Sequence, residues 1–204
     1  MASVYDLKPA FQNRLRPMVS ALVAAGVTPN HLTVAALGGS IAVGATLAIV
    51  RDVPRLLLLL PAWLLTRMAL NAMDGMAARE HGQSSRLGGA LNEVGDVLSD
   101  LTLYLPLALL APGLLWPGVA FALGAVVSEF CGVLGPVLGS RRRYEGPMGK
   151  SDRALLVGLL GLVAGVWPST LSWWPLLLGA AAALTFVTGW NRVAAAVREN
   201  PSAP

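Results

Sequence analysis

Acidic side chains are concentrated in one part of the sequence. Five of the 11 Asp and Glu residues fall within a single stretch of 30 residues in a chain of 204. Residues three or four apart share one face of a helix, so Asn71 and Asp74 share a face of one helix. Asn92, Asp96 and Asp100 share a face of the next helix for the same reason. Oxygen ligands on two facing helices, with no Cys among them, favour a hard divalent ion such as Mg²⁺ or Mn²⁺.

Small and basic residues accompany these oxygen ligands. Gly75, Ala78 and Gly88 leave room for a bulky ligand to approach the backbone. Arg79 and Arg86 can neutralise phosphate oxygens through charge-assisted hydrogen bonds. Because Mg²⁺ usually shares its coordination shell with substrate phosphates, the pattern predicts a metal-bound, phosphate-bearing ligand.

The composition predicts the elements that must hold these residues. Hydrophobic residues make up 55% of the chain and charged residues 13%, whereas soluble domains carry about 25% charged residues. This composition excludes a disordered chain, a coiled coil and almost any soluble enzyme. It indicates an all-α polytopic membrane protein, because crossing a bilayer takes about 20 apolar residues per helix. Six segments meet that need, approximately 31–50, 56–79, 86–111, 114–139, 152–168 and 171–194.

An amphipathic segment precedes the first predicted span. Residues 5–25 mix apolar and basic side chains, which is typical of a helix lying on the membrane surface. A turn then breaks the chain, and either Thr28 or Asn30 can cap the first span. The expected organisation is a surface helix and entry turn over 1–30, a six-helix transmembrane domain over 31–195, and a short cytosolic tail over 196–204.

The distribution of basic residues predicts the orientation. With the N-terminus in the cytosol, 12 of the 15 Lys and Arg residues fall on the cytosolic side. Only Arg51 and Arg55 fall on the other side, and Arg67 falls inside a span. The positive-inside rule then places both termini in the cytosol. The expected location is a bacterial-type inner membrane. Since a carboxylate at the centre of a bilayer costs about 2.5–3.5 kcal/mol, the acidic cluster is expected to line a cavity, which opens to the cytosol.

The same residues resemble the signature of a known family. The CDP-alcohol phosphatidyltransferases, also called CDP-alcohol phosphotransferases, share the pattern Asp-x2-Asp-Gly-x2-Ala-Arg-x8-Gly-x3-Asp-x3-Asp. The chain matches this spacing with Asn71-x2-Asp74-Gly75-x2-Ala78-Arg79-x8-Gly88-x3-Asn92-x3-Asp96. Residues 26–33 also resemble the family's entry to its first span, and the plan of six spans with a surface helix is similar.

The resemblance implies a membrane transferase of phospholipid biosynthesis. In that family an alcohol hydroxyl attacks the β-phosphoryl group of a CDP-linked donor, usually CDP-diacylglycerol, and CMP leaves. One or two Mg²⁺ or Mn²⁺ ions clamp the pyrophosphate. Asp96 would be both a metal ligand and the general base, with Asn71, Asp74 and Asn92 as the other metal positions. The nucleotide site would contain Asn30, Thr33, Gly75, Ala78, Arg79 and Gly88.

Asp100 is an additional candidate ligand, because it lies one turn beyond Asp96 on the same helix face. The Gly and Ala content of the first and last spans favours close helix packing, which suits a homodimer.

Two positions depart from the family pattern. Asn71 and Asn92 stand where the family has Asp, which removes two formal negative charges from the site. Amide oxygens still ligate hard ions, but the lower charge predicts weaker binding of two divalent ions and leaves a one-ion site open. A catalytically silent homologue, which binds CDP-lipid or acts as an assembly subunit, is therefore an alternative. A transporter is a less favoured one.

A basic loop after the fourth span is the candidate acceptor site. It runs from Arg141 to Arg153 and includes Lys150. Its charge can serve orientation and lipid headgroups, or these three residues can bind the phosphate of an acceptor. Glu129, inside the fourth span, needs a polar partner, a cavity or an acceptor. Asn191 and Arg192, near the cytosolic end of the last span, can face the cavity or snorkel to the interface, and snorkelling is the favoured expectation.

Overall fold

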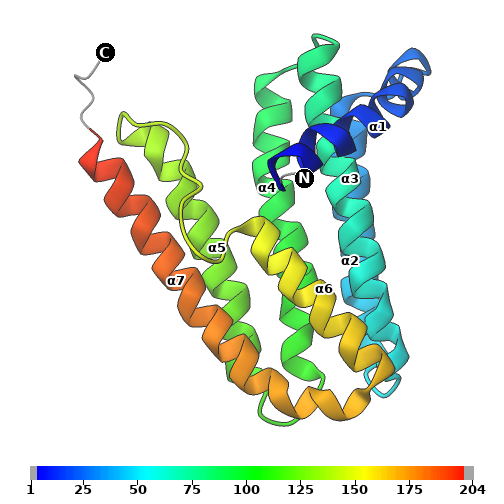
Figure 1. Ribbon diagram of the computed structural model, residues 1–204, viewed down its shortest axis with the longest axis vertical. Helices are drawn as coiled ribbons and strands as arrows, with labels where there is room; N and C mark the ends of the chain where they lie inside the picture. The colour runs from blue at the N-terminus through cyan, green and yellow to red at the C-terminus, as the bar shows by residue number, and fades with distance from the viewer. Residues whose placement is uncertain (1–3, 200–204) are drawn as a thin grey trace. The chain divides into compact units, whose positions relative to one another are not determined.

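The computed structural model describes residues 4–199, and this part of the chain is helical, without a strand (Figure 1). The α-helices are α1 Val4–Ala24, α2 Pro29–Ile49, α3 Leu59–Glu80, α4 Arg86–Tyr104, α5 Leu115–Val137, α6 Lys150–Val166 and α7 Trp174–Arg198. Short 3-10 helices are η1 Pro54–Leu58, η2 Leu105–Leu109 and η3 Pro168–Trp173. The prediction of an all-α protein is confirmed for the described residues.

Each predicted span is helical, and the largest differences from prediction occur at prolines. The predicted segments 56–79, 86–111 and 171–194 each combine an α-helix with 3-10 residues. A proline stands near the start of every 3-10 segment, at Pro54, Pro106 and Pro168. Proline lacks the N–H that a continuing α-helix needs, so the regular helix ends or begins beside it.

Within the described part of the chain, four helical stretches are long and apolar enough to cross a membrane: Pro29–Ile49, Pro54–Glu80, Leu115–Val137 and Pro168–Arg198. Helix α4 carries four charged residues and α6 has 17 residues, so neither resembles a regular apolar span. The count of six spans therefore stays a prediction.

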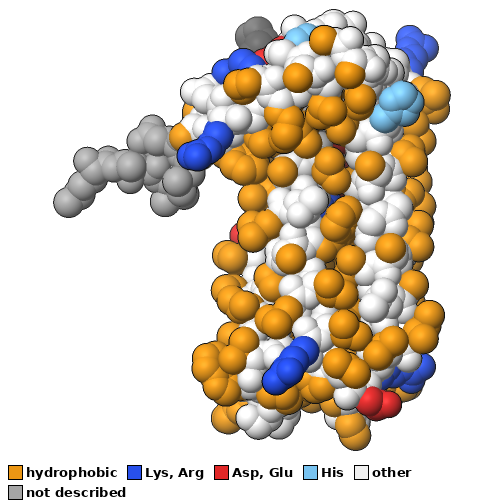
Figure 2. Space-filling model, turned by 90° about the vertical axis from the view of Figure 1, so that its right-hand side faces the viewer, with side chains coloured by type: hydrophobic (Ala, Val, Ile, Leu, Met, Phe, Trp, Pro, Cys, Tyr) orange, Lys and Arg blue, Asp and Glu red, His pale blue; other side chains and the backbone are white. Residues whose placement is uncertain are grey.

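Large apolar side chains are exposed along the helices. Val137 is 79% exposed and Leu176 is 69% exposed. Hydrophobic side chains are also distributed along the whole face shown in Figure 2, with few charged side chains between them. Extensive exposed apolar surface suits contact with lipid rather than with water.

The described chain divides into two compact units. Unit 1 contains α1, the part of α2 up to Ser40, and Trp63–Ser99. Unit 2 contains Ile41–Ala62 and the chain from Asp100 onward. The predicted domain boundaries at residues 30 and 195 stay predictions. Of the predicted tail, the residues up to Arg198 belong to α7, and residues 200–204 lie outside the described part.

In unit 1, α1 packs on α2 and α3 through an apolar cluster. Its buried centre consists of Val19, Leu32, Met73, Met76 and Ala77. An exposed ion pair lies beside it, with Nε of Arg16 2.8 Å from Oε2 of Glu80. Exposed pairs contribute at most about 1 kcal/mol, so apolar burial is the main force that holds α1 in place.

Thr28, one of the two predicted caps, caps the start of α2. Its Oγ1 accepts a hydrogen bond from the backbone N–H of His31 at 3.4 Å. The backbone N–H of Thr28 donates in return to Nδ1 of His31 at 3.2 Å. This reciprocal pair satisfies backbone donors that a helix start leaves without partners. Asn30 therefore lies within the first turn of α2.

In unit 2, α5 and α7 pack side by side (Figure 1). A Cβ added at Gly124 of α5 would lie 1.9 Å from Oγ1 of Thr185 on α7. Helix α6 approaches η1 in the same way, since a Cβ added at Gly161 would lie 2.8 Å from the Leu57 carbonyl oxygen. Glycines therefore let these helices approach closely, as small residues do in membrane helix packing.

Candidate active site

Helices α3 and α4 form an antiparallel pair in unit 1 (Figure 1). The turn between them contains Gly82 with φ of +66°, a left-handed conformation that glycine adopts without strain. Oγ of Ser84 donates to the Ala78 carbonyl oxygen at 2.9 Å, which satisfies an acceptor near the end of α3. The turn therefore helps to set the register in which the polar faces of the two helices meet.

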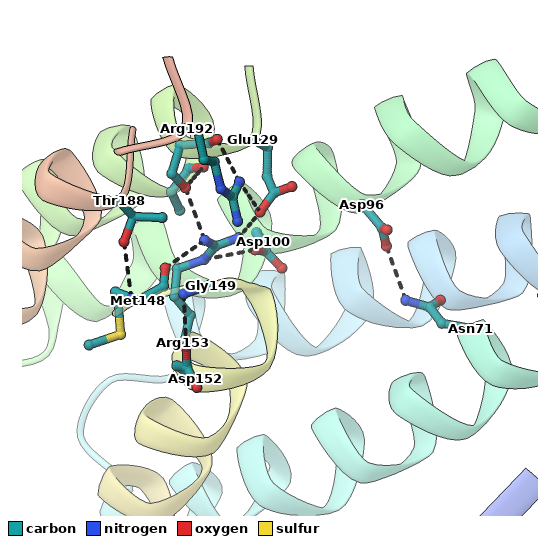
Figure 3. Close-up of polar contacts among 12 residues, drawn as sticks. Asn71, Asp96, Asp100, Glu129, Met148, Gly149, Asp152, Arg153, Thr188 and Arg192 are labelled. Carbon is teal, nitrogen blue, oxygen red and sulfur yellow. Dashed lines mark hydrogen bonds and ion pairs between the residues drawn. The ribbon is translucent and has the colours of Figure 1, made fainter. Parts of the chain in front are cut away.

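Asn71 of α3 and Asp96 of α4 are in direct contact (Figure 3). Nδ2 of Asn71 donates to Oδ1 of Asp96 at 3.0 Å. Arg67, one turn earlier on α3, donates through Nη2 to the same Oδ1 at 3.3 Å and to the Asp96 backbone oxygen at 3.1 Å. The side chains of Arg67 and Asp96 are 4% and 16% exposed, so water screens this ion pair only weakly. The two polar helix faces therefore meet, as the spacing predicts.

A hydroxyl group of α2 contacts the carboxylate of Asp74. Oγ1 of Thr33 lies 3.0 Å from Oδ2 of Asp74 and 3.1 Å from the Pro29 carbonyl oxygen. A hydroxyl has one proton, and the charged carboxylate is the stronger of the two acceptors. Thr33 and Asp74 are both buried. Helix α2 therefore orients a carboxylate of α3.

The signature glycines lie where a side chain would crowd neighbouring polar groups. A Cβ added at Gly88 would lie 3.0 Å from Oδ1 of Asn30, so α4 and α2 adjoin at these two residues. A Cβ added at Gly75 would lie 2.9 Å from the guanidinium group of Arg79. The structure thus pairs four of the residues that were predicted to bind the nucleotide.

Ala78 and Asn92 are half-buried, on α3 and α4 respectively. Asn92 lies one turn before Asp96 on the same face of α4. Except for Asp100, the predicted metal and nucleotide residues all belong to unit 1: Asn30, Thr33, Asn71, Asp74, Gly75, Ala78, Arg79, Gly88, Asn92 and Asp96.

Asp100 belongs to unit 2, where it pairs with Arg153 (Figure 3). Oδ2 of Asp100 accepts hydrogen bonds from Nη2 and Nε of Arg153 at 2.8 and 3.3 Å. Nη2 also donates to Oε1 of Glu129 at 2.9 Å. Nη1 donates to Oγ of Ser128 and to the Met148 carbonyl oxygen, at 3.0 and 3.2 Å. Every nitrogen of this guanidinium group therefore donates to an acceptor within the protein.

Glu129 forms ion pairs with three arginines in unit 2. Besides Arg153, Nη2 of Arg142 lies 3.3 Å from Oε2, and Nη1 of Arg192 lies 3.4 Å from Oε1. Arg192 also donates to the Ser128 backbone oxygen at 2.6 Å. The prediction that Arg192 snorkels to the interface is wrong, since its side chain is 2% exposed. Glu129 and the backbone oxygen satisfy its charge inside the unit.

The loop before α6 is attached to the end of α7. Nη1 of Arg143 lies 3.1 Å from Oε1 of Glu145, and its Nη2 forms an ion pair with Glu199. The Ser140 hydroxyl and the Arg141 backbone N–H donate to Glu199 and lower the pKa of its carboxyl group. Hydrogen bonds from its own backbone N–H and from Arg143 lower the pKa of Glu145.

The three residues predicted to bind an acceptor phosphate have different surroundings. Arg153 is fully buried and paired with carboxylates. Lys150 is half-buried at the start of α6, and Arg141 is exposed on the loop. Their assignment to an acceptor stays a prediction.

A sequence profile for CDP-alcohol phosphatidyltransferases matches residues 26–187, which include every signature position. The chain belongs to the CDP-alcohol phosphatidyltransferase family. This finding confirms the resemblance seen in the signature.

The chain is also similar to individual proteins. The inner membrane protein YnbA of Escherichia coli (strain K12) is 45% identical over 190 residues, which cover 93% of this chain and 94% of YnbA. Phosphatidylinositol phosphate synthase (PgsA1) of Mycobacterium tuberculosis has a similar fold. Its structure with CDP-DAG bound gives a TM-score of 0.76 at 19% identity, covering 92% of this chain and 96% of that one. Its complex with manganese and citrate gives 0.74 at 23% identity, covering 90% and 92%.

Membership of the CDP-alcohol phosphatidyltransferase family supports phosphatidyl transfer from a CDP-alcohol. The similarity to an inner membrane protein and the apolar helices support a membrane location.

The signature residues of this CDP-alcohol phosphatidyltransferase family member fit an oxygen-ligated divalent ion. Asp74 and Asp96 offer carboxylates, and Asn71 and Asn92 offer amide oxygens, which are donors that Mg²⁺ and Mn²⁺ accept. Among residues 4–199, no three His, Cys, Asp or Glu side chains are grouped so that they could hold a metal ion. This agrees with the two Asn residues, which leave two carboxylates where the family pattern has four.

Sequence reasoning missed the part played by Ser128 and Arg142 in unit 2. Ser128 and Glu129 are adjacent polar residues inside an otherwise apolar helix, and both are buried. A buried acid needs a cationic partner, so this Ser–Glu pair was a signal that basic residues would converge on it.

Proposed function

We propose that this chain transfers a phosphatidyl, or related substituted phosphoryl, group from CDP-diacylglycerol or a related CDP-alcohol to a small alcohol, in phospholipid biosynthesis. CMP is the second product. The observation that carries the proposal is the contact of Asn71 with Asp96, which joins two helices that bear the family signature.

In the proposed reaction the hydroxyl oxygen of the acceptor attacks the β-phosphorus of the donor. The bond from that phosphorus to the CMP oxygen breaks, and the acceptor proton passes to the Asp96 carboxylate. Arg67 and Asn71 hold Asp96 from α3, and Thr33 holds Asp74 from α2. A bound Mg²⁺ or Mn²⁺ would be held by Asp74 and Asp96 with the amides of Asn71 and Asn92, and would stabilise charge on the pyrophosphate.

The nucleotide part of the donor is assigned to the glycine-containing faces of unit 1. Gly75 and Gly88 let the polar groups of Arg79 and Asn30 lie against the helix backbones, and the small side chain of Ala78 adds little bulk. Arg79 supplies positive charge for phosphate oxygens, and Asn30 supplies an amide beside Gly88.

The setting we propose is the inner membrane, crossed by six spans with both termini and the site facing the cytosol. Helices α4 and α6 would be the two spans beyond the four apolar stretches. Asp96 and Asp100 of α4 and Arg153 of α6 are held in ion pairs, which lowers the cost of placing these side chains within a bilayer. We also propose a homodimer, which cross-linking in native membranes would reveal as a band of twice the chain mass.

The test is reconstitution of the purified chain in liposomes with CDP-diacylglycerol, Mg²⁺ or Mn²⁺, and a panel of small alcohols with and without phosphate. Release of CMP, together with a new phospholipid detected by mass spectrometry, would support the proposal and identify the acceptor. No CMP release with any metal and acceptor would favour a silent homologue that binds CDP-lipid. Flux of an intact substrate without CMP release would favour a transporter.

A further inference from the structure

Arg67 is a buried cation inside the signature. It lies on α3 one turn before Asn71, and its side chain is 4% exposed. Burying a guanidinium group is costly unless a carboxylate and hydrogen-bond acceptors satisfy it. Asp96 provides both, through Oδ1 at 3.3 Å and its backbone oxygen at 3.1 Å. Arg67 is thus attached to the residue proposed to act as base and metal ligand.

Asn71 reinforces this attachment. Its Nδ2 donates to the same oxygen of Asp96, at 3.0 Å, that accepts from Arg67. One carboxylate oxygen has about two lone-pair positions, and two N–H donors occupy them here. Oδ1 of Asp96 therefore serves these two donors, which disfavours ligation of a metal ion by the same oxygen. An Asp at position 71 would have no N–H to donate, so this arrangement depends on the Asn.

The net charge of the signature residues also favours a single metal ion. The four signature positions carry two carboxylates, Asp74 and Asp96, and the guanidinium of Arg67 offsets one of them. The remaining net charge is −1, whereas the family pattern with four Asp and the same Arg would give −3. Divalent ions are held according to the number of charged ligands, so the lower charge suits one ion far better than two.

We propose that Arg67 takes the electrostatic place of a second divalent ion, so that this site holds a single Mg²⁺ or Mn²⁺. Arg67 acts as a positioning residue, through Asp96, and as a fixed positive charge beside the donor pyrophosphate. The assignment of this charge to the pyrophosphate rests on the proposed function, but the number of ions does not.

The experiment counts Mn²⁺ bound to the purified full-length chain in detergent, by electron paramagnetic resonance of the free ion during titration with Mn²⁺ alone. The wild type should bind one ion per chain. Arg67→Gln should bind Mn²⁺ at least about tenfold more tightly, because a repelling charge is removed. The triple variant Arg67→Gln, Asn71→Asp, Asn92→Asp should bind two ions, and Arg67→Lys should keep the wild-type count and affinity.

Arg55→Gln is the matched control, since it removes an exposed arginine outside the signature. It should leave both the count and the affinity unchanged. Two ions on the wild type, or none, would overturn the inference, and this result needs no variant to fold. An unchanged Mn²⁺ affinity in a folded Arg67→Gln variant would overturn it as well. A wild type that binds one ion but releases no CMP would leave the inference standing and count against the proposed function.

Discussion

Arg153 and Asp100 form an ion pair that is closed to water. Their shortest N–O distance is 2.8 Å, and the two side chains are 0% and 3% exposed. Glu129 accepts from the same guanidinium at 2.9 Å, so one arginine joins α4, α5 and α6 within unit 2. These contacts make Arg153 a structural centre of unit 2.

Replacing Arg153 with Met should therefore destabilise the protein strongly. The change leaves two buried carboxylates without this partner, which typically costs about 3–5 kcal/mol. The measurement is the midpoint of thermal unfolding in detergent, compared with Arg141→Gln, which removes an exposed arginine from the neighbouring loop. Adding Asp100→Asn to Arg153→Met should cost less than the sum of the single changes, because the second change removes one of the two carboxylates that lost this partner. Strict additivity, or a midpoint equal to that of Arg141→Gln, would contradict this role.

Asp96→Asn should abolish most of the transfer activity. If Asp96 accepts the acceptor proton, its loss slows CMP release by about 10²–10⁴-fold, the usual contribution of a general base. Initial rates with CDP-diacylglycerol and the preferred acceptor provide the measurement. Asp52→Asn removes an exposed acid outside the signature and should leave the rate unchanged. A fully active Asp96→Asn variant would remove Asp96 from the mechanism.

Two glycines of α2 should respond oppositely to the same substitution. A Cβ at Gly44 would lie 2.0 Å from the Thr102 carbonyl oxygen, so Gly44→Ala should destabilise unit 2 by about 1–3 kcal/mol. A Cβ at Gly38 would meet nothing within 4 Å, and Ala is the better helix former. Gly38→Ala should therefore leave the unfolding midpoint unchanged or raise it slightly. Equal midpoints for the two variants would show that α2 does not pack closely on Thr102.

The contact of Glu199 with the loop should weaken in acid. Hydrogen bonds, first from Ser140, lower the pKa of Glu199 below its ordinary value of 4.5. Because the pKa of Glu199 is lower in the folded protein than in the unfolded chain, its contacts stabilise the fold fully above the pKa of the unfolded chain. This stabilisation is lost as the pH falls through the pKa of the folded protein. The difference in unfolding midpoint between the wild type and Glu199→Gln should thus be constant near neutral pH and shrink below about pH 4.5. A difference that grows on acidification would have the wrong sign for this contact.

The helices and the facing pair of α3 and α4 could be predicted because their signals are local. Apolar length defined the spans, and spacing by three or four residues placed Asn71 and Asp96 on helix faces that meet. Thr28 was one of two possible caps, and only the geometry of His31 distinguishes it from Asn30.

The polar cluster of unit 2 could not be predicted in the same way. Glu129 contacts Arg142, Arg153 and Arg192, which come from a loop and two other helices. The local sequence around a buried acid does not determine which arginines will contact it, because tertiary packing decides which distant residues lie nearby. The same limit explains the wrong prediction for Arg192, whose position near a helix end resembles that of a snorkelling residue.

The proposed function requires that the signature residues of unit 1 bind the metal ion and the CDP group of the donor. The most direct test is a crystal structure with CDP-diacylglycerol and Mn²⁺, in which anomalous scattering locates the metal. We expect one manganese peak in contact with Asp74 and Asp96, and a cytidine diphosphate group against Gly75 and Gly88. A metal ion or nucleotide bound away from these residues would contradict it.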